Sequence, residues 1–439
     1  MVVRHLYRGG KPPVWPPGAR ERGHSAKRVV LVTDLPADAS IGARIRYYRV
    51  QRGMSRPVLA GLVGGKSAEW VKAIETGKQH SPRLALLLRI AQALELPDLA
   101  MLTGNGHAVP VSVFAGPRHS TLSEVQAALT EYRVSLRTEP VSVSHLAERL
   151  RYAWAVRHSS PDHRTQLGSL LPGLIRDAQV AVRALRGEER REARRVLAGV
   201  YQLADFFVAY QPAPELVWMV ADRAITEAQE ADDPYLIAGG AWAMVQAMRD
   251  DTRWEEAIKL ATDARDQLTP HLDGAPDDWR GMVGALNAEI GYVYARRGRH
   301  GAAWAHWEKA DAVARRLGPD YRHTQSSFSM SVMAAHATTL GVELRRSGEA
   351  LRAANALDPV TIPSLARRSR HLIEVARAHS LNGDRVATLS LLDRSQRVAP
   401  ETISYNGFAR DMLIDLRKNP PTGKRTEVHQ LCSRVGIAA

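Results

Sequence analysis

The sequence predicts an all-α protein made of two helical parts, and three observations lead to this fold class. Apolar residues recur at spacings of three and four along most of the chain after residue 40. Segments rich in glycine and proline interrupt this pattern before residue 40 and again at residues 103–120. Only VVLVTD, residues 29–34, is typical of a strand. We therefore expect a small domain of short helices followed by a long helical domain.

The positive charge of the chain is concentrated at its N-terminal end. The 439 residues carry a formal net charge of +14. Residues 1–40 contain seven Lys or Arg and three Asp or Glu, and residues 41–104 contain ten and four. Ten of the fourteen net charges thus lie in the first quarter of the chain, where we expect a polyanion to bind.

The composition restricts the class of protein. Hydrophobic residues make up 45% of the chain and charged residues 24%, which is typical of a globular protein. No run of about 20 apolar residues is present to cross a bilayer, and the basic, proline-broken N-terminus is unlike a signal peptide. We expect a cytoplasmic protein with no membrane partner. Cys432 is the only cysteine, which excludes an intrachain disulfide and a thiolate zinc cluster.

The pattern divides the chain into five segments. Residues 1–40 are predicted to be a basic flexible arm, because four prolines between positions 12 and 17 disfavour a helix. Residues 41–104 are expected to form the domain of short helices, and residues 105–120 a linker. An irregular helical lead-in is expected at 121–189 and the repeat domain at 190–436, with an unrelated α-bundle as the alternative for this second part.

Five short helices are predicted between residues 41 and 104. Ser40, Ser55 and Ser67 precede the first three and are expected to be their N-caps, while Gly53 and Gly77 end the first and third. The fourth is predicted to begin at Pro82 and the fifth at Pro97. The positions predicted to face the core are Ile41, Ile45, Tyr48, Leu59, Ala60, Val63, Val71, Ile74, Leu84, Leu87, Leu88, Ala91 and Leu94. The arginines predicted to face solvent are Arg44, Arg46, Arg49 and Arg52. Two helices joined by a tight glycine turn predict a helix-turn-helix domain.

This domain resembles the Cro/CI (XRE) class of helix-turn-helix repressors. The resemblance covers residues 41–102 and depends on the segments IGARIRYYR, GMS, SAEWVKAIETG and SPRLALLLRIAQAL. One departure is an extra residue in the turn between the second and third helices, at Gly64 or Gly65, which puts the register of base contacts in doubt. A glycine lengthens a turn at low cost because it can take a positive φ.

The resemblance implies that the third helix enters the major groove of DNA. The implied base-contacting residues are Ala68, Glu69, Lys72 and Ala73. The implied phosphate-contacting residues are Arg56, Lys66, Trp70, Lys78, Gln79 and Arg83. Trp70 lies between the reading and packing faces, so core packing is an equal alternative for it. Since one such domain covers a half-site, a homodimer is expected on an inverted repeat of double-stranded DNA with half-site centres about 34 Å apart.

The second part resembles the tetratricopeptide repeat. In NAEIGYVYARRGRHGAAWAHWEKA, residues 287–310, two helices are predicted around Gly298, with Gly291 and Ala303 allowing close approach. Weaker copies lie before and after it: Gly341 and Ala353 recur in the same frame as Gly291 and Ala303, and Thr388 replaces the usual alanine in the last copy. Together with the N-terminal domain, the chain resembles helix-turn-helix plus tetratricopeptide regulators of actinobacteria.

In that class of regulators the repeat domain binds an effector or mediates dimerisation. We therefore expect a peptide or small-molecule effector on the concave face. The candidate binding residues are Tyr292 and Trp304, for which core packing is the alternative.

The sequence bears on three other functions: a P-loop NTPase, a protein-binding scaffold and an enzyme. Residues 60–67 match a loose P-loop, but the residues before it have helical spacing and no following Walker B strand is present. A non-catalytic adaptor or antitoxin-like scaffold is the alternative to a regulator. Neither a catalytic arrangement nor a cofactor site is found, and the six-residue spacing of His300 and His306 does not suit a metal pair. We expect no enzymatic activity, cofactor or metal.

Overall fold

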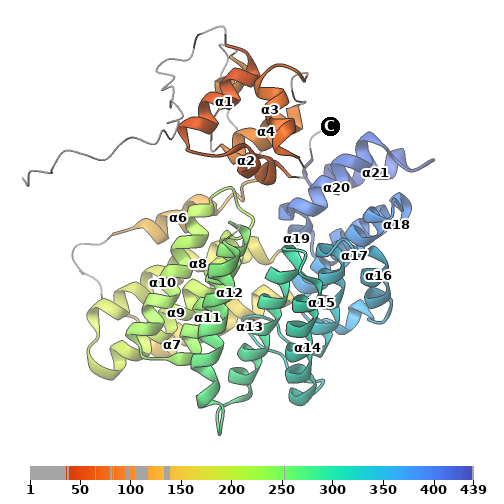
Figure 1. The fold of residues 1–439 in the computed structure, drawn as a ribbon. Helices are drawn as coiled ribbons and strands as arrows, with labels where there is room; N and C mark the ends of the chain where they lie inside the picture. Colours follow the sequence, from red (N-terminus) through yellow and green to blue (C-terminus); the bar gives the residue numbers. More distant parts are fainter. Residues whose placement is uncertain are drawn as a thin grey trace, which may run out of the picture. The chain divides into compact units, whose positions relative to one another are not determined.

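The computed structural model describes most of the chain as two compact units, residues 1–114 and residues 115–439. The residues described are 36, 39–64, 66–79, 82, 84–94, 96, 98–104, 117–132, 139–251 and 253–437. Within these residues all regular elements are helical (Figure 1), which confirms the predicted all-α class. The predicted arm, with its VVLVTD segment, lies outside the described residues apart from positions 36, 39 and 40.

The first unit contains the five predicted helices. They are α1 (Ile41–Gln51), α2 (Arg56–Val63), α3 (Ala68–Glu75), α4 (Leu84–Ala93) and α5 (Ala100–Thr103). The hydroxyls of Ser40, Ser55 and Ser67 accept from the backbone N–H three residues later, so all three predicted N-caps are confirmed. The helices predicted to start at Pro82 and Pro97 are described from Leu84 and Ala100, and Pro97 itself lies outside the described residues. Such short helices depend on a shared core rather than on intrinsic helix propensity.

One apolar cluster forms that core. Its buried members are Ile45, Leu59, Ala60, Val63, Val71, Ile74, Leu87, Ile90, Ala91, Leu94, Leu96, Leu99 and Leu102. Ile41, Tyr48 and Leu88 are only partly buried against it. The structure does not describe the side chain of Leu84.

The prediction that Arg44, Arg46, Arg49 and Arg52 face solvent is wrong for two of them. Arg46 and Arg52 are exposed, but Arg44 and Arg49 are buried. Arg44 donates from Nε to the Ala39 carbonyl, 2.9 Å away, and Arg49 is paired with Glu75. Helical spacing alone does not identify a charged side chain that has a partner from another helix.

The second unit is a series of helices, and successive helices pack on one another (Figure 1). Its helices are α6 (Leu122–Thr130), α7 (Val143–Ser159), α8 (His163–Ala184), α9 (Gly187–Val208), α10 (Pro214–Glu230), α11 (Pro234–Asp250), α12 (Trp254–Leu268), η2 (Thr269–His271), α13 (Asp277–Arg296), α14 (His300–Leu317), α15 (Met330–Glu343), α16 (Ser347–Asn355), η3 (Pro359–Thr361), α17 (Leu365–Leu381), α18 (Arg385–Val398), α19 (Pro400–Tyr405), α20 (Gly407–Lys418) and α21 (Arg425–Arg434). The predicted boundary at 189/190 falls near the start of α9, which packs directly on α8. The helical stack therefore continues through it. No helix in the described part of the chain is both long and apolar enough to cross a membrane.

The odd-numbered helices form the inner layer of this stack. From α7 to α17 each odd helix contacts the next odd one, whereas the even helices from α8 to α18 pack mainly on their sequence neighbours. The first inner helix, α7, also contacts the last, α17. Side chains of α7, α9, α11 and α17 therefore surround one central space.

Close packing within the stack agrees with the repeat pattern in one hairpin and departs from it in the next. A Cβ added to Gly291 would lie 3.0 Å from the Ala303 carbonyl oxygen, which confirms that predicted pair. Gly341, predicted to oppose Ala353, instead approaches Ala350, whose backbone nitrogen would lie 2.7 Å from such a Cβ. The hairpin of α15 and α16 is thus shifted by three residues relative to the consensus frame.

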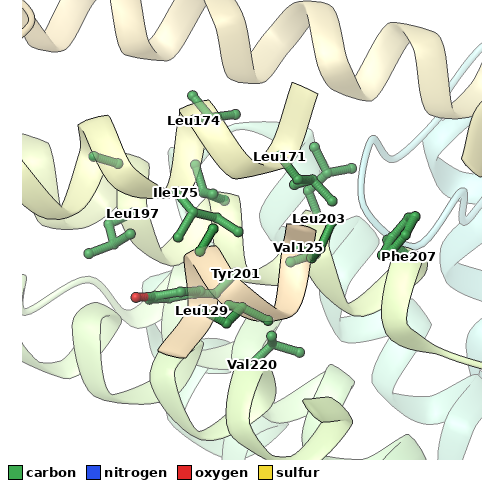
Figure 2. Close-up of a cluster of buried hydrophobic side chains, with 14 of the residues drawn as sticks. Val125, Leu129, Leu171, Leu174, Ile175, Leu197, Tyr201, Leu203, Phe207 and Val220 are labelled. Atoms are coloured by element: carbon green, nitrogen blue, oxygen red, sulfur yellow. The ribbon is translucent and has the colours of Figure 1, made fainter. Parts of the chain in front are cut away.

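Long apolar side chains fill the spaces between the helices. In Figure 2, residues of α6, α8, α9 and α10 interdigitate around Tyr201, with Leu171 and Phe207 completely buried. This cluster reaches from Leu122 to Ala224 and makes the start of the second unit a packed core.

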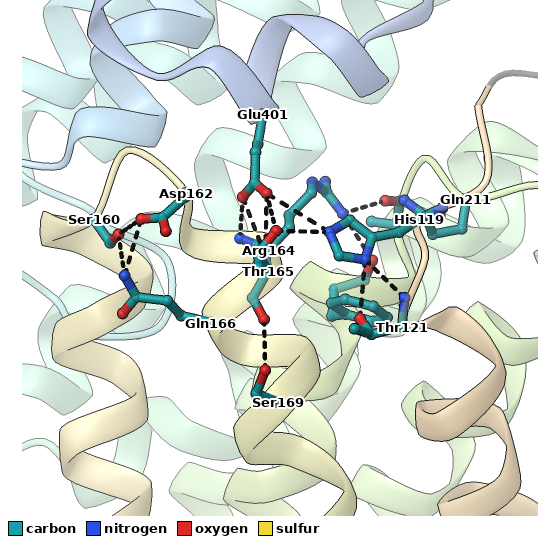
Figure 3. A network of polar contacts seen from close by, with 12 residues as sticks. His119, Thr121, Ser160, Asp162, Arg164, Thr165, Gln166, Ser169, Gln211 and Glu401 are labelled. Carbon is teal, nitrogen blue, oxygen red and sulfur yellow. Dashed lines mark hydrogen bonds and ion pairs between the residues drawn. The ribbon is translucent and has the colours of Figure 1, made fainter.

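A polar network joins the beginning of the second unit to its later part (Figure 3). The Glu401 carboxylate of α19 accepts from the backbone nitrogens of Arg164, at 2.6 Å, and Thr165, at 3.2 Å, in the first turn of α8. His119 belongs to the predicted linker, yet it is buried and its backbone N–H donates to Gln211. Glu401 therefore acts as a cap for α8 from 237 residues away along the chain.

Candidate functional site

The turn between α2 and α3 is a helix–glycine–helix connection. α2 ends at Val63, and Gly64 follows with φ of +86°, a left-handed conformation that suits glycine. Ser67 then caps α3, and its Oγ lies 3.2 Å from the Trp70 nitrogen. A P-loop would need a strand directly before this segment. Residues 56–63 are helical instead, so the P-loop interpretation is excluded.

A buried ion-pair cluster fixes the end of α3 to α1 and α2. The Glu75 carboxylate is completely buried and lies between Arg49 and Arg56. Arg49 donates to it from Nε and, at 3.2 Å, from Nη2, and Arg56 donates from Nε at 2.7 Å. Arg49 also donates to the Met54 carbonyl at 2.6 Å. One carboxylate thus orients three helices, although burying it without both partners would be costly.

The side of α3 opposite the core carries the predicted base-contacting residues. Glu69 and Lys72 are exposed, and Ala68 and Ala73 are half-buried beside them. Hydrogen bonds from the Glu69 backbone nitrogen and the Ser67 side chain hold the pKa of the Glu69 carboxyl below its ordinary value. Glu69 is therefore ionised near neutral pH, while Lys72 presents an ammonium on the same face.

The predicted phosphate-contacting residues lie around this face. Lys66, Lys78 and Gln79 are exposed, and the Lys66 ammonium lies 5.4 Å from the centre of the Trp70 ring. The side chain of Arg56 is one-third exposed, and its Nε is engaged by Glu75. Ser55, Arg56 and Lys72 line a shallow surface groove together with Glu69. Arg83 lies outside the described residues.

Two functional positions were not singled out from the sequence. Glu75 lies in the segment WVKAIETG, whose pattern gives it no role, because its partner Arg49 is 26 residues away, beyond any local spacing rule. Gly42 is the second, because a Cβ there would lie 2.1 Å from the Ile74 carbonyl oxygen at the end of α3. Its signal was a glycine early in an otherwise helical segment, where glycine disfavours the helix unless packing requires it.

The candidate effector residues lie together in the second unit, although not around its central space. Tyr292 on α13 is buried, and Arg249 lies over its ring at 4.6 Å. Trp304 lies on α14, an outer helix, and packs edge-on against Trp307 at 5.4 Å. Both residues join one apolar cluster with Leu340. The expectation that Trp304 lies on the concave face is therefore wrong, since helical spacing does not tell inner from outer helices.

Metal chemistry has no visible basis in the part of the chain that the structure describes. There, no group of three or more His, Cys, Asp or Glu side chains is arranged to hold a metal ion. His306 is half-buried, and burial is the main cause that lowers its pKa to about 4. His300 lies 3.3 Å from Glu349 instead of facing His306.

Comparison with known families identifies the first unit. Residues 40–102 match a family model described as a helix-turn-helix domain, which agrees with the limits of α1 to α5. These residues therefore form a helix-turn-helix domain, a fold in which the second helix of the motif, at the position of α3 here, enters the DNA major groove. A search of curated proteins finds no match to the chain.

Solved structures also match the chain, and two of them match most of its length at low similarity. Bacillus thuringiensis PlcR, solved with the peptide PapR7 and DNA, is 13% identical with a TM-score of 0.28, over 81% of this chain and 99% of that chain. ComR from S. thermophilus, solved with DNA and its signalling peptide ComS, is 14% identical with a TM-score of 0.24, over 82% and 99%. Similarities this low leave the function to be argued from the chain's own residues.

Proposed function

We propose that this protein is a sequence-specific transcriptional regulator that binds double-stranded DNA through α3. The observation that carries the proposal is the exposed face of α3 in a helix-turn-helix domain. Lys72 is exposed there beside Ala68 and Ala73, and the buried Glu75 cluster holds the helix in place. A lysine donates to guanine O6 or N7, an alanine contacts a thymine methyl, and the Glu69 carboxylate accepts from cytosine N4.

The charge around α3 supports phosphate contact. Among residues 39–64 and 66–79, the only exposed acid is Glu69, whereas Arg46, Arg52, Lys66, Lys72 and Lys78 are exposed bases. Such an excess attracts a polyanion and makes its binding depend strongly on salt. Arg56 keeps two roles in the proposal, as a partner of Glu75 and as a phosphate contact at the groove beside α2.

A homodimer on an inverted repeat is part of the proposal. One recognition helix reads only a few base pairs, so two copies related by a two-fold axis are needed to specify an operator. The two half-sites should then lie about 34 Å apart, or one helical turn of B-DNA.

Selection from a random duplex library tests this function. The full-length protein should enrich a two-fold symmetric sequence, and log affinity for that sequence should fall linearly with log salt concentration. Failure to enrich any sequence at low salt, with the protein folded, would rule out the regulator and favour the adaptor or antitoxin-like alternative.

The second unit is proposed to sense an effector. Its inner helices surround a cavity of about 400 Å³, within the range of small-molecule sites. An effector changes DNA affinity only if it binds one arrangement of the dimer better than another. The measurement is operator affinity with and without a compound that binds the second unit, and unchanged affinity for every such compound would contradict sensing.

A further inference from the structure

The cavity of the second unit has a wall of arginines. It lies among α7, α8, α9, α10, α11, α17 and α19. Five arginines line it, and we call the space the arginine cavity: Arg157, Arg164, Arg249, Arg367 and Arg370. The acids in its lining are Asp205, Asp250 and Asp251. Arginines are seldom buried without a partner, so a buried arginine in the lining that lacks an acidic partner indicates a ligand.

Two of the five arginines are satisfied within the protein. Arg249 donates to Asp250 at 3.1 Å and to Glu289 at 2.6 Å. Arg370 donates to Glu374 at 2.7 Å and to the Tyr210 hydroxyl at 2.6 Å. These two guanidiniums have counter-charges, so they need no ligand.

In the described part of the chain, no acidic side chain makes a hydrogen bond to the guanidinium of the other three arginines. Arg157 is 9% exposed, and its Nε and Nη1 make no hydrogen bond to any residue that the structure describes. Arg164 is 5% exposed and donates from Nη1 to the carbonyls of Phe207 and Ala209, while its Nε is unpaired. Arg367 donates from Nη2 to the Ser326 carbonyl, and its Nε is likewise unpaired. Buried donors of this kind are rare unless something else accepts from them.

Arg157 is also repelled by the other two guanidiniums. Burial, followed by repulsion from Arg367 and Arg164, lowers the pKa of Arg157. An arginine keeps its proton even in such surroundings, so the repulsion stays as a destabilising term. An anion placed between the three would remove the repulsion and accept from the unpaired N–H groups.

Neutral donors and an apolar wall complete the lining. Gln211 Nε2 and Thr402 Oγ1 also line this cavity, and both atoms are buried without a hydrogen-bond partner among the described residues. Phe206, Val217 and Trp218 contribute apolar surface beside them, and the Arg157 guanidinium lies 4.8 Å from the Phe206 ring centre. The cavity thus has polar donors on one side and aromatic or aliphatic surface on the other.

We propose that the arginine cavity binds a small organic anion, whose carboxylate or phosphate is held by Arg157, Arg164 and Arg367 and whose body packs on Phe206 and Trp218. This ligand class deepens the effector role and rests on the proposed function. A volume of about 400 Å³ suits a compound of metabolite size. A long peptide would have to extend beyond this cavity.

Calorimetric titration of the full-length protein tests the proposal with three probes at constant ionic strength: inorganic phosphate, phenyl phosphate and benzoate. At least one should bind with saturation, and the comparison separates phosphate from carboxylate recognition and shows whether the aromatic body adds affinity. The variant Arg157→Met should bind that probe roughly 10- to 100-fold more weakly, since it loses charged hydrogen bonds. Arg367→Met serves as a second variant with the same expectation.

The control is Arg397→Gln on α18, which removes an exposed arginine that pairs with Asp393. It should bind the probe as the wild type does. The anion-free Arg157→Met protein should unfold at a higher temperature than the wild type, because a buried repulsion is removed. Replacing a purely structural arginine would not raise the unfolding temperature and weaken anion binding together.

Three results would overturn the proposal: no probe binds, Arg157→Met binds as tightly as the wild type, or Arg397→Gln loses binding equally. Operator binding measured on the same samples separates this inference from the proposed function. A wild type that binds its DNA site but no probe contradicts the anion site alone, whereas probe binding without any DNA binding contradicts the regulator.

Discussion

Asp205 shows how one buried residue makes the stability of the second unit depend on pH. Burial and the neighbouring Asp250 raise its pKa to about 7, against the opposing effect of Arg249 and Arg164. The unfolded chain loses this proton near pH 4, whereas the folded protein keeps it until about pH 7. The contribution of Asp205 to stability is therefore greatest in acid and is lost as the pH rises from 4 to 7.

The variant Asp205→Asn removes this dependence. At pH 8 the free energy of unfolding should rise by up to about 4 kcal/mol, and at pH 4 it should change little. Denaturant unfolding at the two pH values measures the difference. Asp222→Asn, at an exposed position on α10, is the control. Equal effects of Asp205→Asn at both pH values would contradict the assignment.

At the scale of elements, the approach of α1 to α3 depends on Gly42. An added Cβ would meet the Ile74 carbonyl at 2.1 Å, and backbone has to move to relieve it. Gly42→Ala should destabilise the first unit by roughly 1–3 kcal/mol through overpacking. Gly61→Ala in α2, where nothing lies within 4 Å of the added Cβ, should leave stability unchanged or raise it by up to about 1 kcal/mol.

Hydrogen exchange in the full-length protein measures both glycine variants. Gly42→Ala should lower protection of the α1 and α3 amides, and Gly61→Ala should not. If Gly42→Ala and Gly61→Ala lowered the protection of these amides equally, the close approach of α1 to α3 would not explain why residue 42 is a glycine.

Elements that depend on local rules were predictable, and those that depend on distant partners were not. Ser40, Ser55 and Ser67 act on residues three positions away, so the sequence pattern alone identified them as caps. The Arg49–Glu75 pair joins separate helices and carries no local signal. Gly341 opposes Ala350 because it lies two residues before the end of α15, whereas Gly291 lies five residues before the end of α13, and a fixed repeat frame misses this difference.

For the whole molecule, buried histidines predict that acid destabilises the second unit. Burial is the main cause that lowers the pKa of His158, His323, His336 and His371 to about 4 and that of His163 to about 2. The unfolded chain protonates these histidines near pH 6.5, so their stabilising effect is complete above that pH and is lost as the pH falls toward 4. The raised carboxyl pKa values of Asp205, Glu227 and Glu289 act in the opposite direction, but these acids are fewer than the five histidines.

The two units should respond differently to acid. All histidines that the structure describes lie in the second unit. From pH 7.5 to 5, protection from hydrogen exchange, corrected for the intrinsic pH effect, should fall more in α7 to α18 than in α1 to α4. An equal loss in both units would contradict this account of the histidines.

The central claim is that α3 reads DNA sequence, and a substitution of the exposed Lys72 tests this claim most directly. The measurement is the affinity of the wild type and Lys72→Ala for the selected operator and for each of its single base-pair variants, at one salt concentration. We predict that Lys72→Ala loses about 1–3 kcal/mol on the operator and no longer discriminates at one base pair in each half-site. Lys309→Ala, at an exposed lysine of α14, should bind as the wild type does. A uniform loss on all sequences, or no loss, would contradict base reading by α3.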